Sequence, residues 1–169
     1  MKILCDSREK WTQPNSKDTH ISAYFDRHGI EWEVCALGVG DYQIEGKPTV
    51  SVDRKKNLSE LSKNLMNRDD KGRFWREVRR AKEQGIKLYI LCEHGGQIKS
   101  IRDVAKWKDK YSGVSGRTLM EKIFALHIGW ELKFCSAIRE ARQELFAKFY
   151  KKMLTNNGLL CIILSVGQY

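Results

Sequence analysis

Two aspartates and a lysine have types and spacing that could support phosphoryl chemistry. Asp53 and Lys55 are two residues apart in a stretch typical of a strand, so both side chains point to one face. If the hairpin before them turns symmetrically about Lys47, Asp41 lies directly across from Asp53, with Cβ atoms about 4.5–5.5 Å apart. Two carboxylates this close repel each other unless a cation lies between them, and Mg²⁺ prefers such oxygen ligands. Lys55 could then orient or activate the attacking water, or stabilise charge on a phosphate.

The spacing Asp-(x)11-Asp-x-Lys is that of a metal-dependent phosphodiesterase site on a strand hairpin. Asp-x-Lys is a common sequence, however, so the pattern alone slightly favours an exposed strand face with alternating charges. The surrounding charge shifts that balance. Between residues 54 and 87 there are twelve Lys or Arg and five Asp or Glu, which gives +7 of the +10 net charge of the 169-residue chain.

A basic helix is expected directly after this hairpin, over residues 73–84. Arg73, Arg76 and Arg80 fall on one stripe of it, and arginine binds phosphate in a bidentate manner. For the apolar residues on the same helix, core packing is favoured over stacking on bases; these are Phe74, Trp75 and Val78. The net charge favours nucleic acid as the partner, ahead of an anionic membrane surface, although a merely solvated basic surface would also produce it.

The elements that must position these residues follow from hydrophobic periodicity. Strands are predicted over 2–5, 30–37, 41–44, 49–54, 86–92 and 130–135, with a turn at 46–48. In the second of these strands, the predicted core face carries Ile30, Trp32, Val34 and Ala36. Helices are predicted over 16–28, 58–66, 73–84, 101–107, 116–127 and 137–153. This order predicts an α/β fold in a single domain, with an antiparallel hairpin inside a mixed sheet.

Composition excludes several classes of protein. The content of 41% hydrophobic and 31% charged residues, with two prolines, is that of a globular domain rather than a disordered or repetitive chain. Five widely spaced cysteines without a Cys-x-x-Cys pair predict buried free thiols. No apolar run approaches the roughly 20 residues of a membrane span, so we expect no membrane partner and a cytoplasmic or nucleoid-associated protein. The segment around Gly116 lacks phosphate-loop spacing, so no nucleotide cofactor is expected.

Four ordered motifs resemble those of the XPF-type structure-specific endonuclease domain. They are Cys5-Asp6-Ser7-Arg8-Glu9, Leu37-Gly38-Val39-Gly40-Asp41-Tyr42, Val52-Asp53-Arg54-Lys55, and Gly72-Arg73-Phe74 with Glu77. The resemblance implies a restriction-endonuclease-like fold with a central mixed sheet flanked by helices. It also implies dependence on Mg²⁺ or Mn²⁺ and cleavage of branched, flapped or forked DNA. On this basis we expect a nuclease domain over 1–154 and a short apolar C-terminal tail of unknown role over 155–169.

The resemblance also implies roles for individual residues. Asp41 and Asp53 would be metal ligands, Lys55 the catalytic lysine, and Asp6 a group at the edge of the metal site. Site or phosphate-binding roles fall to Arg8, Arg54 and Arg73, with Arg76 and Arg80 added from the basic stripe. Glu9 matches the first motif without an assigned role.

The sequence departs from the family pattern at several positions. Asp53 replaces the usual glutamate, and Glu77 stands where the family often has glutamine. The next acidic residue of the family would fall at Ser59, whereas the acid here is Glu60, which leaves the role of Glu60 open. No tandem helix-hairpin-helix region follows, so a homodimer or a separate targeting subunit is expected to help find DNA. The alternative function is a non-catalytic DNA-binding module that keeps the nuclease fold.

Overall fold

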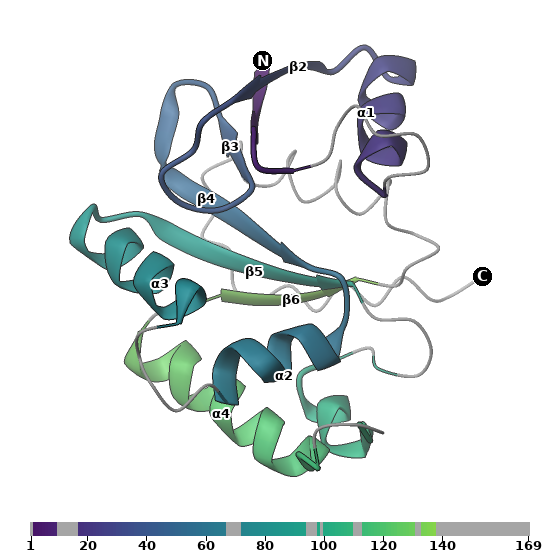
Figure 1. Cartoon of the computed structure of the whole chain (residues 1–169), viewed down its shortest axis with the longest axis vertical. Coiled ribbons are helices and arrows are strands. Elements are labelled where there is room, and N and C mark those ends of the chain that lie inside the picture. Colours follow the sequence, from purple (N-terminus) through teal and green to yellow (C-terminus); the bar gives the residue numbers. More distant parts are fainter. Residues whose placement is uncertain are drawn as a thin grey trace. The chain divides into compact units, whose positions relative to one another are not determined.

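The computed structural model describes residues 2–9, 17–66, 72–93, 98, 100–109, 113–130 and 133–137 (Figure 1). Six strands are hydrogen-bonded in the order β2-β1-β3-β4-β5-β6. β1 pairs with β2 in parallel and with β3 antiparallel, and β3 pairs antiparallel with β4. The predicted mixed sheet with flanking helices and an antiparallel hairpin is therefore confirmed.

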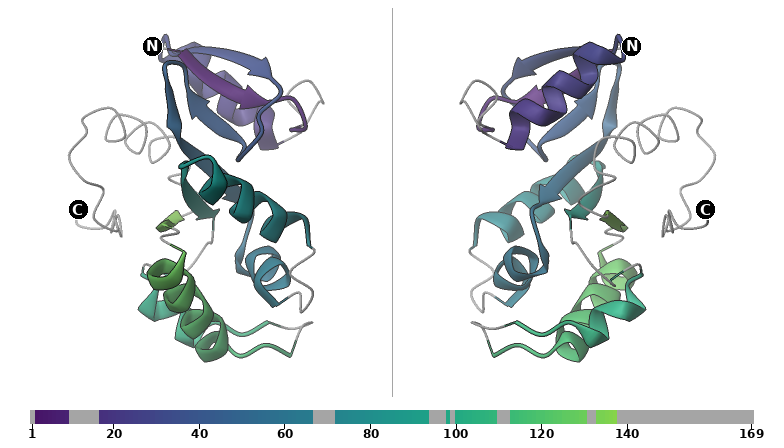
Figure 2. Two further views of the ribbon diagram at one scale, coloured as in Figure 1. Left: turned by 90° about the vertical axis from the view of Figure 1, so that its left-hand side faces the viewer. Right: turned by 90° about the vertical axis from the view of Figure 1, so that its right-hand side faces the viewer.

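The chain divides into two compact units, residues 1–53 with 77–89 and residues 54–76 with 90–169. The first unit holds β1 (Lys2–Asp6), α1 (Lys17–Arg27), β2 (Glu31–Cys35), β3 (Tyr42–Ile44) and most of β4 (Lys47–Lys55). Figure 2 shows α1 lying along one face of strands β1 to β3. Apolar side chains that are almost fully buried hold this unit together: Ile3, Cys5, Ile21, Phe25, Tyr42 and Val52.

The second unit holds α2 (Leu58–Met66), η1 (Arg102–Lys106), α4 (Gly116–Gly129) and β6 (Lys133–Ala137). Two further elements, α3 (Arg73–Glu83) and β5 (Lys87–Glu93), contribute residues to both units. α2 lies beside α4, which packs on η1 (Figure 1). The buried apolar residues here include Leu58, Leu61, Leu65, Phe74, Ile90, Leu91, Leu119 and Ile123.

Most predicted elements agree with the structure. α2 has the predicted bounds, because Leu58, Leu61 and Leu65 recur at helical spacing and all become buried. β5 is buried at every position after its first residue, as its continuous apolar sequence predicts. The segment at 102–106 forms a 3₁₀ helix instead of an α-helix. Of the helix predicted over 137–153, Ala137 instead ends a strand, and the rest lies outside the described residues, as does the tail over 155–169. The domain bounds therefore stay predictions.

The predicted core face of β2 is wrong. Val34 is 42% exposed, Ala36 is exposed, and Trp32 and Ile30 are only half-buried. β2 stands at the end of the strand order, where it pairs with β1 alone among the described residues. The Trp32 indole donates a hydrogen bond of 2.8 Å to the exposed Asp26. A strand at the edge of a sheet can alternate apolar and polar residues although neither of its faces is completely buried.

The turn of the β3–β4 hairpin also differs from the prediction. It lies at residues 45–46, where Gly46 has a φ of +77°, and β4 already begins at Lys47. An irregularity between Gln43 and Ile44 restores the register beyond the turn. None of the helices among the residues that the structure describes is long and apolar enough to cross a membrane.

Candidate active site

Three aspartates lie on or directly beside neighbouring strands of the first unit. Cys5 of β1 pairs with Tyr42 of β3, and Tyr42 pairs with Val52 of β4. Continuing the first register by one residue places Asp6 opposite Asp41. Asp41 and Asp53 are the residues next to the Tyr42–Val52 pair, which has the alignment expected of a turn about Lys47. The direct opposition of Asp41 and Asp53 stays a prediction, because the Asp41 N–H donates to the carbonyl oxygen of Val52.

Main-chain hydrogen bonds hold Asp41 between β1 and β4. The Asp6 N–H donates to the Asp41 carbonyl oxygen at 2.8 Å, and the Asp41 N–H donates to the Val52 carbonyl oxygen at 2.7 Å. The backbone of Asp41 is thus held from both neighbouring strands. A carboxylate on such a backbone has little freedom beyond its own side-chain torsions.

All three carboxylates are buried. The exposed fractions are 1% for Asp6, 8% for Asp41 and 2% for Asp53. These values exclude the exposed, alternately charged strand face that the spacing alone slightly favours. Burying ionised carboxylates is costly unless positive charge or hydrogen-bond donors compensate them.

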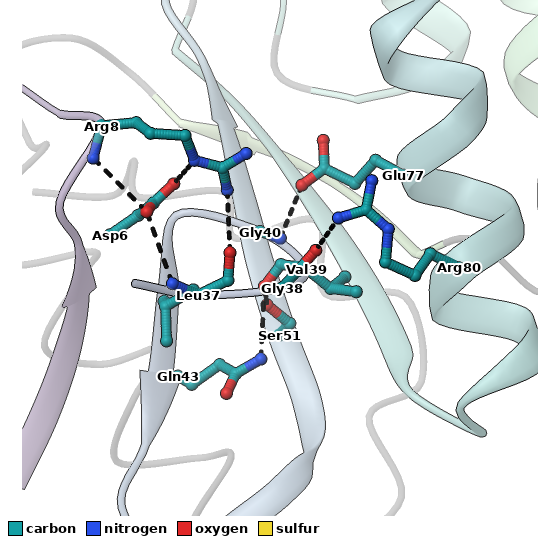
Figure 3. A network of polar contacts seen from close by, with 10 residues as sticks. All are labelled: Asp6, Arg8, Leu37, Gly38, Val39, Gly40, Gln43, Ser51, Glu77 and Arg80. Carbon is teal, nitrogen blue, oxygen red and sulfur yellow. Dashed lines mark hydrogen bonds and ion pairs between the residues drawn. The ribbon is translucent and has the colours of Figure 1, made fainter. Parts of the chain in front are cut away.

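An arginine compensates Asp6. The Arg8 Nε atom forms an ion pair with Asp6 Oδ2, and the Arg8 Nη2 atom donates to the Leu37 carbonyl oxygen at 3.1 Å (Figure 3). The guanidinium therefore ties Asp6 to the segment that leads into Asp41. A role of Arg8 in binding phosphate stays a prediction, as does a catalytic role of Asp6.

Asp41 and Asp53 have the donor chemistry of a magnesium site. Among the described residues, no three His, Cys, Asp or Glu side chains gather closely enough to hold a metal ion. A pair of carboxylates is nonetheless a typical protein contribution to Mg²⁺, which keeps several waters and completes its shell with substrate phosphates. Two buried carboxylates fit Mg²⁺ or the similar Mn²⁺ better than Zn²⁺, which needs three or four protein ligands.

The segment before Asp41 is held by polar contacts from several elements (Figure 3). The Gly40 N–H donates to Glu77 Oε1 of α3 at 2.6 Å, and Arg80 Nη1 donates to the Gly38 carbonyl oxygen at 2.5 Å. From the strand side, the Ser51 hydroxyl donates to the Val39 carbonyl oxygen at 2.6 Å. Sequence reasoning gives Glu77 no role, since its partner is 37 residues away. Phosphate binding by Arg80 stays a prediction.

In the second unit, Lys55 is 8% exposed at the end of β4, and its ammonium nitrogen lies 5.5 Å from the centre of the Phe74 ring. This distance is within the range of cation–π attraction. Phe74, Trp75 and Val78 are all buried, which confirms their prediction as core residues.

Arg54 points away from the Lys55 side of β4, because successive strand residues alternate. Its guanidinium lies 3.4 Å from Oε1 of Glu93 at the end of β5, and the two side chains are 9% and 1% exposed. Glu93 was missed by sequence reasoning, and the only signal for it is a single acid at the end of an apolar strand. The predicted phosphate contact of Arg54 stays a prediction, but its observed partner is a buried carboxylate.

Of the remaining arginines, Arg73 and Arg76 are exposed on α3. Exposure leaves their guanidinium groups accessible to a phosphate backbone, as their predicted role requires. Glu9 is half-buried, and its N–H donates to the Asp6 carbonyl oxygen at 3.1 Å.

Glu60 caps α2. Its carboxylate accepts from the Lys56 N–H at 3.0 Å, while its own N–H donates to Asn57 Oδ1 at 2.8 Å. This reciprocal arrangement satisfies backbone donors at a helix start in the manner of a capping box. Ser59, which takes the position of the family's acid, donates to Asp109 Oδ1 at 3.4 Å. Glu60 therefore has a structural task that needs no metal.

The cysteines that the structure describes with side chains are free thiols: Cys5, Cys35 and Cys92. Cys5 and Cys92 are buried, as predicted, whereas Cys35 is only half-buried. Burial raises the pKa of Cys5 to about 12, with a smaller contribution from Cys35. Burial also raises the pKa of Cys92, which sits near Glu60 and Glu93. Cys5 and Cys92 are thus protonated packing residues rather than nucleophiles at neutral pH.

A mixed sheet with flanking helices, with buried carboxylates on β4 and directly before β3, places the protein in the α/β class. Residues 5–146 match the family model described as the ERCC4 domain. The chain belongs to the ERCC4-domain family.

Solved structures share the fold. XPF from Aeropyrum pernix matches with a TM-score of 0.64 and 19% sequence identity, over 93% of this chain and 66% of that chain. A second structure, described as XPF from Aeropyrum pernix in complex with DNA, matches with a TM-score of 0.64 and 19% identity, over 94% of this chain and 67% of that chain. This protein thus spans about two thirds of the length of those chains. No curated protein matches the sequence.

Proposed function

We propose that this protein is a divalent-metal-dependent endonuclease that hydrolyses phosphodiester bonds in branched, flapped or forked DNA. The observation that carries the proposal is the burial of two carboxylates in an ERCC4 domain, Asp53 on β4 and Asp41 directly before β3, the strand that pairs with β4. Nucleases of this family generally depend on a divalent metal. The solved XPF structure in complex with DNA supports DNA as the substrate.

Each site residue has a defined task in this proposal. Asp41 and Asp53 hold Mg²⁺ or Mn²⁺, which when bound would supply positive charge against the phosphate oxygens. Lys55, two residues beyond Asp53 on β4, orients the attacking water and stabilises charge on the phosphate. The exposed Arg73 and Arg76 bind the phosphate backbone of the DNA.

Cleavage of end-labelled DNA with Mg²⁺ tests the proposal. The substrates are single-stranded, duplex, flap, fork and four-way DNA, and the variants are Asp53→Asn and Lys55→Ala. Glu83→Gln and Lys63→Ala are matched controls, because they make comparable changes at exposed positions. We expect cutting of a branched substrate by the wild type and controls, with a loss of at least about 100-fold in both site variants. Site variants that cut as fast as the wild type would contradict the assignment.

Mn²⁺ titration separates this function from a non-catalytic DNA-binding module. A nuclease binds Mn²⁺ in a manner that depends on Asp41, whereas a pure binding module binds DNA without it. Light scattering on the protein, with and without fork DNA, tests whether a homodimer forms. A strictly monomeric protein would favour a separate targeting subunit.

A further inference from the structure

Two residues of α3 hold the segment that leads into Asp41. Glu77 Oε1 accepts the Gly40 N–H at 2.6 Å, and Arg80 Nη1 reaches the Gly38 carbonyl oxygen at 2.5 Å. Glu77 and Arg80 are three residues apart, so they project from the same side of the helix. Figure 3 shows both side chains directed at this segment.

Gly40 links the hydrogen bond from Glu77 to Asp41, the next residue in the chain. Its φ of +72° is a conformation that glycine adopts readily and other residues rarely do. A Cβ atom at this position would lie 2.1 Å from the Ser51 hydroxyl and 2.8 Å from the Val52 carbonyl oxygen. The main chain of Gly40 therefore lies directly against β4, with Glu77 accepting its N–H.

The main-chain groups of Asp41 itself are also held by hydrogen bonds. The Asp41 N–H donates to the Val52 carbonyl oxygen at 2.7 Å, and the Asp41 carbonyl oxygen accepts from Asp6 at 2.8 Å. Successive main-chain groups are thus fixed by Glu77, β4 and β1. Loss of the first of these would free the peptide that sets the direction of the Asp41 side chain.

We propose that Glu77 is a positioning residue that aims the Asp41 carboxylate at the divalent cation by accepting the Gly40 N–H. The proposal rests on the proposed function. Glu77 is 9% exposed, so water does not readily replace it as the acceptor. This role depends on where the acceptor oxygen of Glu77 lies.

Two substitutions separate the effect of the length of the Glu77 side chain from the effect of its charge. Glu77→Gln keeps the length of the side chain and an acceptor oxygen but removes the charge. Glu77→Asp keeps the charge but shortens the side chain by one methylene, which moves the acceptor away from Gly40. Positioning requires Glu77→Gln to be the milder change, whereas a ligand or electrostatic role requires Glu77→Asp to be milder.

Mn²⁺ binding without DNA, followed by electron paramagnetic resonance, is the primary readout for the full chain. We expect Glu77→Asp to weaken Mn²⁺ binding about 10-fold or more, while Glu77→Gln stays within about threefold of the wild type. Cleavage rates with Mg²⁺ should follow the same order. Glu83→Gln, on the exposed side of α3, is the control and should match the wild type.

Unfolding by urea is measured in parallel, and Mn²⁺ binding is compared only under conditions where each variant is folded. Equal binding by Glu77→Asp and the wild type, or weaker binding by Glu77→Gln than by Glu77→Asp, would overturn the positioning role. Asp53→Asn is included to separate the two proposals. If Asp53→Asn binds Mn²⁺ like the wild type, the proposed metal site fails; if it loses binding, only the behaviour of Glu77 is in question.

Discussion

The main-chain N–H of Asp6 donates a 2.8 Å hydrogen bond to the carbonyl oxygen of Asp41. This bond joins the last residue of β1 to the residue directly before β3. Asp6 and Asp41 each have a buried carboxylate. The charge on Asp6 is in turn paired with Arg8, which also reaches the Leu37 carbonyl oxygen. The geometry of the proposed metal site and the stability of the first unit therefore depend on some of the same groups.

Replacing Arg8 should destabilise the fold more than replacing a surface cation. Arg8→Ala leaves the 1%-exposed Asp6 without its ion pair, and we expect a loss of about 1–2 kcal/mol in the free energy of unfolding. The loss stays below that of a fully buried pair, because the Arg8 side chain is 42% exposed. Lys2→Ala, which breaks an exposed pair with Glu33, should cost less than about 1 kcal/mol. Urea unfolding of both variants checks the order, and equal losses would contradict it.

Substitutions at Gly40 and Gly46 separate the cost of backbone strain from the cost of a steric clash. Both have positive φ, +72° and +77°, but a Cβ atom at Gly46 would have nothing within 4 Å. Gly46→Ala should therefore cost about 1 kcal/mol for the backbone conformation alone. Gly40→Ala should cost about 1–3 kcal/mol more, because Ser51 and β4 must move. Unfolding free energies measure the difference, which would be absent if this part of the chain repacked freely.

The Phe74 ring should contribute to the function of Lys55. Phe74→Leu keeps an apolar side chain but removes the ring that lies 5.5 Å from the ammonium group. Cation–π attraction of about 0.5–2 kcal/mol corresponds to a slowing of cleavage by about 2- to 30-fold. Phe74→Tyr keeps the ring and is the matched control. Single-turnover cleavage at saturating Mg²⁺ gives the rates; a Phe74→Leu rate equal to that of the wild type would mean that the ring only fills space.

The buried Cys5 thiol should make stability fall at alkaline pH. Its pKa rises from 9.0 to about 12 on folding, so above pH 9 the unfolded chain loses this proton while the folded chain keeps it. This contribution to stability is fully present below pH 9 and is lost as pH rises towards 12. The slope can reach about 1.4 kcal/mol per pH unit for one proton.

Cys5→Ala removes that proton and tests the cause. The free energy of unfolding should fall less between pH 8 and pH 10 in Cys5→Ala than in the wild type. Between pH 7 and pH 8 the two proteins should change nearly in parallel, because the Cys5 thiol stays mostly protonated in both the folded and the unfolded chain there. Parallel behaviour over the whole range would show that Cys5 does not contribute.

Local periodicity predicts much of this fold. The spacing of Leu58, Leu61 and Leu65 defines α2, and the uninterrupted apolar run defines β5. The pairing of Tyr42 with Val52, next to Asp41 and Asp53, also has the alignment expected of a hairpin centred on Lys47. The exposure of Val34 does not follow, because whether a strand lies at a sheet edge depends on pairing with distant segments.

The candidate site shows the same division. Asp53 and Lys55 are recognisable because a charged pair two residues apart shares one face of a strand. The contacts of Glu77 with Gly40 and of Glu93 with Arg54 join residues 37 and 39 positions apart, and no sequence period relates them. Such supporting residues become identifiable only after the chain has folded.

The contacts on residues 37–40 fall on main-chain atoms: the carbonyl oxygens of Leu37, Gly38 and Val39 and the N–H of Gly40. Every amino acid except proline offers these atoms, so the shape of this segment depends little on which residue occupies position 38. A Cβ atom at Gly38 would meet nothing within 4 Å, whereas position 40 has no such latitude. The first glycine of Gly-Val-Gly-Asp can therefore be replaced without a steric clash, whereas the second is required by its positive φ and by the close approach of β4.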